Sequence, residues 1–305
     1  MRPALFCLLL AATLFIVMST GTARGAPEGF SIEPVVWEFS RDYPEFTPGD
    51  SALPINRVYL KTHDGTDWMS VYDEHPQAVS GPDALRRTVD IYGAQGIDVV
   101  AWFVPKGWDI ETQLVMAGQV LESGVTALFA DIEPFPGFCE LDCPFLGSHF
   151  WPRLRERYPA AELGVIYDPR PVNWERSGLF DWMRTANTAL PMCYWISFVD
   201  QPPWNDPAGC VRQARADLGM LAPGAALQYV PMLQGDAPAD QVRSALLATS
   251  EAGASRASIW RRGVVSPDTW SMIAAYRGEV DARLATPPDP CLLAHMRLGR
   301  RAGLC

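Results

Sequence analysis

Short apolar segments recur along the chain, and most are followed or preceded by a segment with helical spacing. The apolar segments are rich in Val, Ile, Tyr and Trp and are bounded by Gly, Pro or Asp, which is typical of strands. The predicted strands are Pro34–Ser40, Arg57–Thr62, Asp98–Val104, Thr126–Ile132, Leu163–Tyr167, Pro191–Phe198, Ala226–Met232 and Ala257–Arg261. The predicted helices are Ala84–Ala94, Ile110–Ser123, Phe150–Tyr158, Gly178–Asn187, Pro207–Leu221, Ala239–Glu251 and Pro267–Arg277.

This alternation predicts an α/β fold, a single-domain (β/α)8 TIM barrel. Helix start signals such as Asp109 with Glu111, and Gly96 and Gly124 at C-cap positions, support the assignment. A doubly wound open sheet is the alternative, but no G-x-G-x-x-G follows the first strand. The stretch Phe39–Asn56 has no helical pattern, which predicts an irregular first crossover.

The N-terminus predicts an export signal that leaves a soluble mature chain. Arg2 is followed by the apolar run Ala4–Met18 and by small residues, with cleavage expected after Ala23 or Gly25. The apolar run is shorter than a membrane span needs, and a retained signal anchor is the alternative. We therefore expect a leader over residues 1–25, a barrel over 26–284 and a tail over 285–305. The predicted location is secreted, periplasmic or on the cell envelope.

Composition and charge narrow the class of partner. Of 305 residues, 48% are hydrophobic and 20% are charged, an ordinary globular balance, and the net charge is −10. Nucleic-acid binding is excluded on this basis because it needs a basic footprint. The 11 Trp residues suit carbohydrate binding, although most Trp residues in proteins are structural. The sequence predicts a carbohydrate partner and neither a metal nor another cofactor, and it says nothing of oligomeric state.

The cysteines predict disulfides rather than zinc. Cys7 leaves with the leader, and with only four His in the chain the remaining cysteines lack the spacing of a zinc site. Six cysteines allow 15 pairings, and proximity along the chain favours one of them in an oxidising compartment. The favoured pairs are Cys139–Cys143, Cys193–Cys210 and Cys291–Cys305.

The strongest candidate chemistry lies at the end of the fourth strand, which reads Val125–Glu133. Residues two apart in a strand share a face, so Asp131 and Glu133 would project the same way, about 6.5–7 Å apart. Glycosidases use such pairs of carboxylates, one of them as a proton donor. The structural alternative is an acidic strand end that caps a helix or binds an Arg. We expect Asp131 and Glu133 to be the catalytic residues.

The other predicted strand ends carry polar and aromatic side chains. Because the active site of a (β/α)8 barrel lies where its strands end, these side chains should converge there. The predicted substrate-binding residues are Lys61, Asp64, Trp102, Tyr167, Asp168, Tyr194, Trp195, Gln228 and Trp260. Structural alternatives stay open: the Trp residues could fill the barrel, Lys61 could pair with Asp131 or Glu133, and Asp168 could shape a turn before Pro169.

Two motifs give a family resemblance. Lys61-Thr62-His63-Asp64-Gly65-Thr66 resembles the second-strand K-x-x-[ED]-G-T pattern of glycoside hydrolase family 25, the muramidase-type lysozymes, and Asp131-Ile132-Glu133 is similar to its fourth-strand D-x-E. Ile166-Tyr167, Tyr194-Trp195 and Gln228-Tyr229 resemble its aromatic strand ends, over residues 33–277. The resemblance implies a barrel, sugar cleavage, Glu133 as proton donor, and Asp131 as electrostatic partner or as orienter of an N-acetyl group.

The first strand differs from that of the family, in which the first strand carries a D-x-S motif. Here the strand reads Val35-Val36-Trp37-Glu38-Phe39-Ser40, in which Glu38-Phe39-Ser40 could act as an E-x-S. Two hypotheses follow: a secreted glycosidase of polysaccharide or peptidoglycan-type glycans, and a degenerate barrel that binds carbohydrate without cleaving it. A different barrel hydrolase is the third, but no G-x-S-x-G or H-E-x-x-H occurs.

Overall fold

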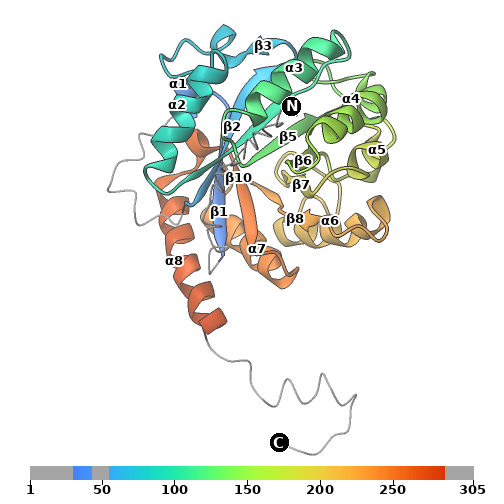
Figure 1. Ribbon diagram of the computed structural model, residues 1–305. Coiled ribbons are helices and arrows are strands. Elements are labelled where there is room, and N and C mark those ends of the chain that lie inside the picture. Colours follow the sequence, from blue (N-terminus) through green and yellow to red (C-terminus); the bar gives the residue numbers. More distant parts are fainter. Residues whose placement is uncertain (1–29, 43–54, 286–305) are drawn as a thin grey trace, which may run out of the picture.

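The computed structural model describes residues 30–42 and 55–285, and side chains as far as Tyr276. Its strands are all parallel in the barrel, and pairing of β1 with β2 closes the ring (Figure 1). Around the ring the strands are β1 (Ser31–Val36), β2 (Arg57–Asp64), β4 (Asp98–Val104), β5 (Ala127–Ile132), β6 (Glu162–Tyr167), β7 (Thr188–Cys193), β9 (Met232–Gln234) and β10 (Arg256–Trp260). The predicted (β/α)8 barrel is therefore confirmed.

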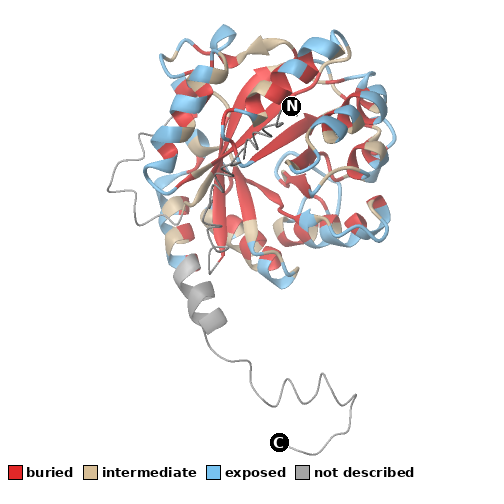
Figure 2. Cartoon of the chain, in the orientation of Figure 1, coloured by how far each residue is buried: buried red, intermediate tan, exposed pale blue. Residues whose placement is uncertain are grey.

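Helices cover the outside of the barrel, as the alternating sequence pattern predicts. They are α1 (Phe39–Asp42), α2 (Pro82–Gly93), α3 (Ile110–Leu121), α4 (Cys143–Arg157), α5 (Leu179–Met183), α6 (Pro207–Leu221), α7 (Ala239–Glu251) and α8 (Pro267–Ala285). Short 3-10 helices are η2 (Met69–Val71), η3 (Pro171–Asn173) and η4 (Arg262–Val264). The strands and the inner helix faces are buried, while the outer helix faces are exposed (Figure 2).

The interior of the barrel and the layer beneath the helices form two separate cores. Along β5, Ala127 and Phe129 belong to the inner core, and Leu128 and Ala130 to the outer core. The ring of Phe129 occupies the space beside Gly164 of β6, where a Cβ atom would lie 2.0 Å from it. The period-2 alternation of a strand therefore decides which side chains can reach a cavity inside the barrel.

Several predicted element boundaries are wrong for local reasons. The first strand ends at Val36 because the carboxylate of Asp42 accepts the N–H groups of Trp37 and Glu38 and turns the chain into α1. Helix α1 therefore begins within the stretch predicted to have no helix. The sixth strand, β7, begins at Thr188 and ends at Cys193, three residues earlier at its start than predicted, because it pairs with β6 from Gly164 onward.

The seventh strand is interrupted rather than continuous. It consists of β8 (Gln228–Tyr229) and β9, which are separated by Val230 and Pro231. Pro231 has no N–H to donate to a strand ladder. A separate two-residue strand, β3 (Asp67–Trp68), pairs antiparallel with the end of β2.

Some predictions fall on parts of the chain that the structure does not describe. The predicted leader over residues 1–25 and the predicted Cys291–Cys305 disulfide lie outside the described residues. Ala285, which was assigned to the tail, is the last residue of α8.

Candidate active site

A cavity of about 220 Å³ lies inside the barrel where the strands end. Side chains from all eight barrel strands or the loops that follow them form its wall. They are Trp37, Lys61, Trp102, Val104, Asp131, Glu133, Phe138, Ile166, Met192, Tyr194, Met232 and Trp260. A cavity of this kind, mainly apolar with a few convergent polar groups, is typical of a small-molecule or sugar site.

Strand β5 places both carboxylates in this cavity. Asp131 continues the inward series of Ala127 and Phe129, whereas Ile132 packs in the outer core. Glu133 follows directly and also lines the cavity. The prediction that the two carboxylates share a face is therefore confirmed by their common place in the wall, although their catalytic role stays a prediction.

Burial keeps the carboxylates from ionising at their usual pH. It raises the pKa of Glu133 to about 7, and the charge of Asp168 adds to the rise while that of Arg170 opposes it. Burial also raises the pKa of Asp131, and the negative charge of Glu133 raises it further. The positive charge of Lys61 opposes this rise. Near neutral pH the pair therefore holds a proton that it can donate.

Asp131 is deeply buried yet lacks a full set of partners. Its side chain is 4% exposed, and Oδ1 has no hydrogen-bond partner among the described residues. Buried carboxylate oxygens are normally paired, because desolvating them is costly. The unpaired oxygen is therefore suited to accept a donor from a ligand in the cavity.

Lys61 reaches the cavity without pairing with either carboxylate. Its Nζ lies 3.0 Å from Oδ2 of Asp64, whose Oδ1 lies 2.7 Å from Nζ of Lys106. The same ammonium lies 5.5 Å from the ring centroid of Trp37 and 5.3 Å from that of Trp102. The structural alternative of an ion pair between Lys61 and Asp131 or Glu133 is therefore wrong, and Asp64 holds Lys61 rather than lining the cavity itself.

Aromatic side chains build the rest of the wall around Trp260. Its ring centroid lies 5.7 Å from that of Trp37, 5.7 Å from that of Trp102 and 6.3 Å from that of Tyr194. The Tyr194 hydroxyl donates to Sδ of Met232 at 3.0 Å. Indole faces of this kind present the apolar, electron-rich surface on which sugar rings stack.

Asp42 fixes the loop that carries Trp37 into the cavity. Its buried carboxylate accepts the backbone N–H of Trp37 at 3.0 Å, of Glu38 at 3.3 Å and of Gly263 at 3.1 Å. Nη1 of Arg261, the residue after the cavity-lining Trp260, donates to the same carboxylate at 2.8 Å. One buried carboxylate thus ties together the ends of β1 and β10.

Replacing Asp42 with Ala is expected to lower the free energy of unfolding by about 3–5 kcal/mol, because it removes a fully buried carboxylate that pairs with Arg261 and accepts three backbone N–H groups. Urea denaturation measures the change. The matched control is Asp181→Ala, whose partner Arg184 is 75% exposed, and there we expect less than about 1 kcal/mol. Equal effects of the two substitutions would contradict this role of Asp42.

Three predicted substrate-binding residues lie away from the cavity. Tyr167 has the opposite strand parity to Ile166 and is buried in the outer core. Trp195, past the end of β7, is also in the outer core, where its Nε1 donates to Gln241 at 2.8 Å. Gln228 begins the interrupted seventh strand, so it lies at the opposite end of the barrel and accepts from Arg256. These three predictions are wrong as to position.

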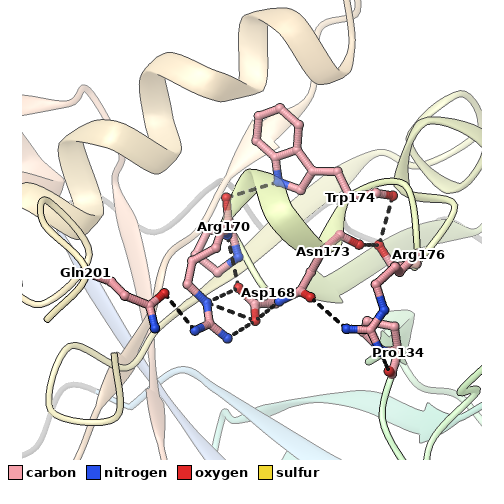
Figure 3. Close-up of polar contacts among 9 residues, drawn as sticks. Pro134, Asp168, Arg170, Asn173, Trp174, Arg176 and Gln201 are labelled. Atoms are coloured by element: carbon pink, nitrogen blue, oxygen red, sulfur yellow. Dashed lines mark hydrogen bonds and ion pairs between the residues drawn. The ribbon is translucent and has the colours of Figure 1, made fainter. Parts of the chain in front are cut away.

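Asp168 is absent from the cavity wall and is not free to bind substrate. Its carboxylate accepts N–H groups from Arg170 and Asn173, and its side chain is 5% exposed (Figure 3). Asp168 therefore forms an ion pair with Arg170 in place of the predicted contact with substrate. Lys61, Trp102, Tyr194 and Trp260 are the predicted binding residues that the structure does bring into the cavity wall.

Several residues of the cavity wall are not among the residues that the sequence predicts for the site. Trp37, Phe138, Met192 and Met232 line the cavity but were absent from the predicted site. Met192 lies two residues before Tyr194, so strand parity alone could have found it. Phe138 comes from the loop after Glu133, and no periodic signal marks it.

The cysteines show one of the predicted pairs. Cys139 and Cys143 form a disulfide, and both sulfur atoms lie 3.5 Å from the backbone oxygen of Glu133. The predicted Cys193–Cys210 disulfide is wrong, because both side chains are buried, free thiols. The two thiols nonetheless interact, since the neighbouring Cys193 contributes to raising the pKa of Cys210 after the larger effect of burial.

Within residues 30–42 and 55–285, no group of three or more His, Cys, Asp or Glu side chains is arranged to hold a metal ion. Among the helices of the described chain, none is both long and apolar enough to cross a bilayer.

Solved structures with a similar fold include several enzymes that act on glycans. The chain superposes on a GH18 chitinase from Pseudoalteromonas aurantia with a TM-score of 0.57 and 13% identity, covering 81% of this chain and 98% of that one. The endo-1,4-beta-mannanase from Rhizomucor miehei gives 0.58 and 10%, covering 87% and 97%. The spore cortex-lytic enzyme SleL from Bacillus cereus gives 0.54 and 11%, covering 82% and 74%.

At these identities the likeness shows the fold. The chain is a (β/α)8 barrel of the architecture that these glycoside hydrolases share. A particular resemblance to glycoside hydrolase family 25 is not shown. No protein-family model and no curated protein matches the sequence.

Proposed function

We propose that the protein is an exported glycoside hydrolase, with Glu133 as the proton donor. One observation carries this proposal: two carboxylates with raised pKa values, the buried Asp131 and the partly buried Glu133, share an aromatic cavity at the carboxyl ends of the strands. A carboxylic acid that stays protonated near neutral pH is what protonation of a glycosidic oxygen requires. The fold of known glycan-cleaving enzymes supports the same class.

The proposed reaction begins with a sugar ring packed between the Trp side chains. Glu133 donates its proton to the oxygen of the scissile bond, and that oxygen leaves with the bonding electrons. Positive charge then develops on the sugar ring and is stabilised by Asp131 in its ionised form. Water adds to the ring carbon and returns a proton to Glu133, which restores the acid.

Asp131 has a second role open to it. Its unpaired Oδ1 could accept the N–H of an acetamido group and so align the acetamido oxygen as an internal nucleophile. This route would restrict the substrates to glycans that contain N-acetylhexosamine. Chitin-type and peptidoglycan-type glycans satisfy that condition, whereas mannan does not.

The second candidate function is carbohydrate binding without cleavage. The first strand favours it, because it has no Asp to match the D-x-S of glycoside hydrolase family 25, and the residue that lines the cavity after this strand is Trp37. Glu38, the nearest carboxylate, is engaged by Arg41 at 2.8 Å. In this reading the aromatic walls hold a sugar, and Glu133 contributes to affinity alone.

Incubation of the purified chain with oligomers of N-acetylglucosamine, with peptidoglycan fragments and with mannan oligomers tests the proposal. Mass spectrometry of the products measures cleavage, and calorimetry measures binding. We expect shorter products from at least one N-acetylated substrate. Binding without products would support the second candidate. If the chain neither binds nor cleaves any of these glycans, both candidates are contradicted.

A further inference from the structure

Asp168 lies beside Glu133 at the ends of two neighbouring strands. The register of β5 and β6 pairs Asp131 with Ile166 and Ile132 with Tyr167, so the next pair along is Glu133 and Asp168. Paired strands lie about 4.8 Å apart. Ile132 and Tyr167 both face the outer core, so the residues that follow them turn toward the interior.

Arg170 holds the Asp168 carboxylate with unusually many donors. Its Nε lies 2.9 Å from Oδ1 and 3.1 Å from Oδ2, its Nη2 also donates to Oδ2, and its backbone N–H lies 2.9 Å from Oδ1. Asn173 adds a hydrogen bond from Nδ2 at 2.7 Å (Figure 3). Because several hydrogen bonds join the two groups at once, the orientation of the Asp168 carboxylate relative to the Arg170 guanidinium is fixed.

The guanidinium of Arg170 is itself held from its other side. It lies 4.1 Å from the ring centroid of Phe198 and donates to Oε1 of Gln201 at 3.1 Å. Both contacts come from the loop between β7 and α6. Arg170 therefore has fixed neighbours on two elements, and its charge cannot move away from Asp168 without breaking them.

The same network reaches the backbone next to Glu133. Nη2 of Arg176 donates to the carbonyl oxygen of Pro134 at 2.8 Å, and its Nη1 lies 3.4 Å from Oδ1 of Asn173 (Figure 3). Asn173 thus connects the Asp168 ion pair to the loop that leaves Glu133. The position of the Glu133 side chain and that of the ion pair are coupled through these contacts.

Several charged and titratable groups face Glu133. Asp131 shares its strand, Asp168 and Arg170 follow β6, and Tyr194 follows β7. Lys61 and its partner Asp64, with Lys106, lie on the far side of Asp131. After burial, the charges of Asp168 and Arg170 act on the pKa of Glu133, the first raising it and the second lowering it.

We propose that Asp168 and Arg170 are positioning residues that together decide over which pH range Glu133 keeps its proton. Asp168 favours the protonated acid, and Arg170 limits that effect while holding Asp168 in place. This inference rests on the proposed function in that it assigns the pair a purpose in proton donation. The ion pair then acts through Glu133 and touches no substrate.

Opposite shifts from the two halves of the pair provide the test. Asp168→Asn leaves the charge of Arg170 unbalanced, so the titration midpoint of Glu133 should fall by about one pH unit. Arg170→Met leaves the charge of Asp168 unbalanced, so the midpoint should rise. Two readouts apply: the alkaline limb of kcat/KM, and the carboxyl ¹³C resonance of Glu133, which Glu133→Gln assigns by its absence.

Controls separate charge from damage to the fold. Arg170→Lys keeps the charge and should leave the midpoint near that of the natural protein. Asp181→Asn and Arg184→Met remove the two halves of an exposed ion pair of 3.0 Å and should not move it. Thermal unfolding verifies each variant, and if Asp168→Asn does not fold, the comparison of Arg170→Met with Arg170→Lys decides.

Shifts in the same direction for both halves, or no shift in either, would overturn the inference. The resonance readout needs no turnover, so the inference and the proposed function can fail separately. If the natural protein cleaves no glycan but the Glu133 resonance shifts in opposite directions, the proposed function fails and the electrostatic coupling stands. If glycans are cleaved and the alkaline limb and the resonance stay fixed, the inference alone fails.

Discussion

Replacing Glu133 with Gln is expected to lower kcat/KM on the cleaved glycan by about 10²–10⁴-fold, with the fold intact. Gln has nearly the same shape as protonated Glu, so the cavity wall formed with Trp102 and Tyr194 should survive. The amide has no acidic proton to give to the glycosidic oxygen, and the leaving group must depart as an alkoxide. Steady-state kinetics on an N-acetylglucosamine oligomer measures the loss.

Glu38→Gln is the matched control for this experiment. Glu38 is the carboxylate that could replace the first-strand Asp of glycoside hydrolase family 25, yet the structure pairs it with Arg41 at 2.8 Å and leaves it out of the cavity wall. We expect less than about threefold change in kcat/KM, because Gln keeps the size of Glu38 and this side chain does not line the cavity. A comparable loss in both variants, or turnover by Glu133→Gln at the natural rate, would remove Glu133 as the acid.

Replacing Glu133 with Gln is also expected to stabilise the fold at alkaline pH by about 3 kcal/mol, because each unit of a raised pKa corresponds to about 1.36 kcal/mol. Burial raises the pKa of Glu133 from 4.5 to about 7, so the folded chain holds this proton more tightly than the unfolded chain does. Between these two values the unfolded state ionises first, and stability falls as pH rises. Above pH 7 the full cost is present, and Gln avoids it because it stays neutral.

Urea denaturation of the natural protein and of Glu133→Gln at pH 4 and pH 8 measures this difference. The two proteins should be close in stability at pH 4, where both side chains are neutral, and Glu133→Gln should be the more stable at pH 8. Equal or lower stability of Glu133→Gln at pH 8 would mean that Glu133 ionises in the fold without cost. In both predictions, burial raises the pKa of Glu133. The raised pKa lets Glu133 donate a proton near neutral pH, and it lowers the stability of the fold at higher pH.

The local pattern predicted the strand that carries the carboxylates. The run Val125–Glu133 is apolar on both faces, so it indicates a buried strand whatever the rest of the fold. Strand alternation then puts Asp131 and Glu133 on one side, and β5 has this geometry. Lys61, Trp102, Tyr194 and Trp260 were found by the same argument, since each lies near the end of its own strand.

Errors arose where a boundary or a partner depends on contacts far along the chain. Gln228 looked like a strand end, but the break at Pro231 makes it a strand start at the other end of the barrel. Trp195 is an exception, because the alternation that puts Met192 and Tyr194 in the cavity wall leaves Cys193 and Trp195 in the outer core. Asp168 forms an ion pair with Arg170 instead of the predicted substrate contact. Arg170 is held in place by Phe198 and Gln201, which lie about 30 residues further along the chain.

The sequence by itself determined the order of strands and helices, the face that Asp131 and Glu133 share, and the closeness of Cys139 to Cys143, because each follows from spacings of a few residues. The tertiary structure alone decided that Asp64 neutralises Lys61, that Trp37 from β1 meets Trp260 from β10, and that Arg170 holds Asp168 beside Glu133. The contact of Trp37 with Trp260 depends on closure of the ring, which brings β1 and β10 together. The two ion pairs join residues that are close in sequence, but the fold decides which side chains lie near enough to pair. Burial within that ring, rather than the residues alone, raises the pKa of Glu133.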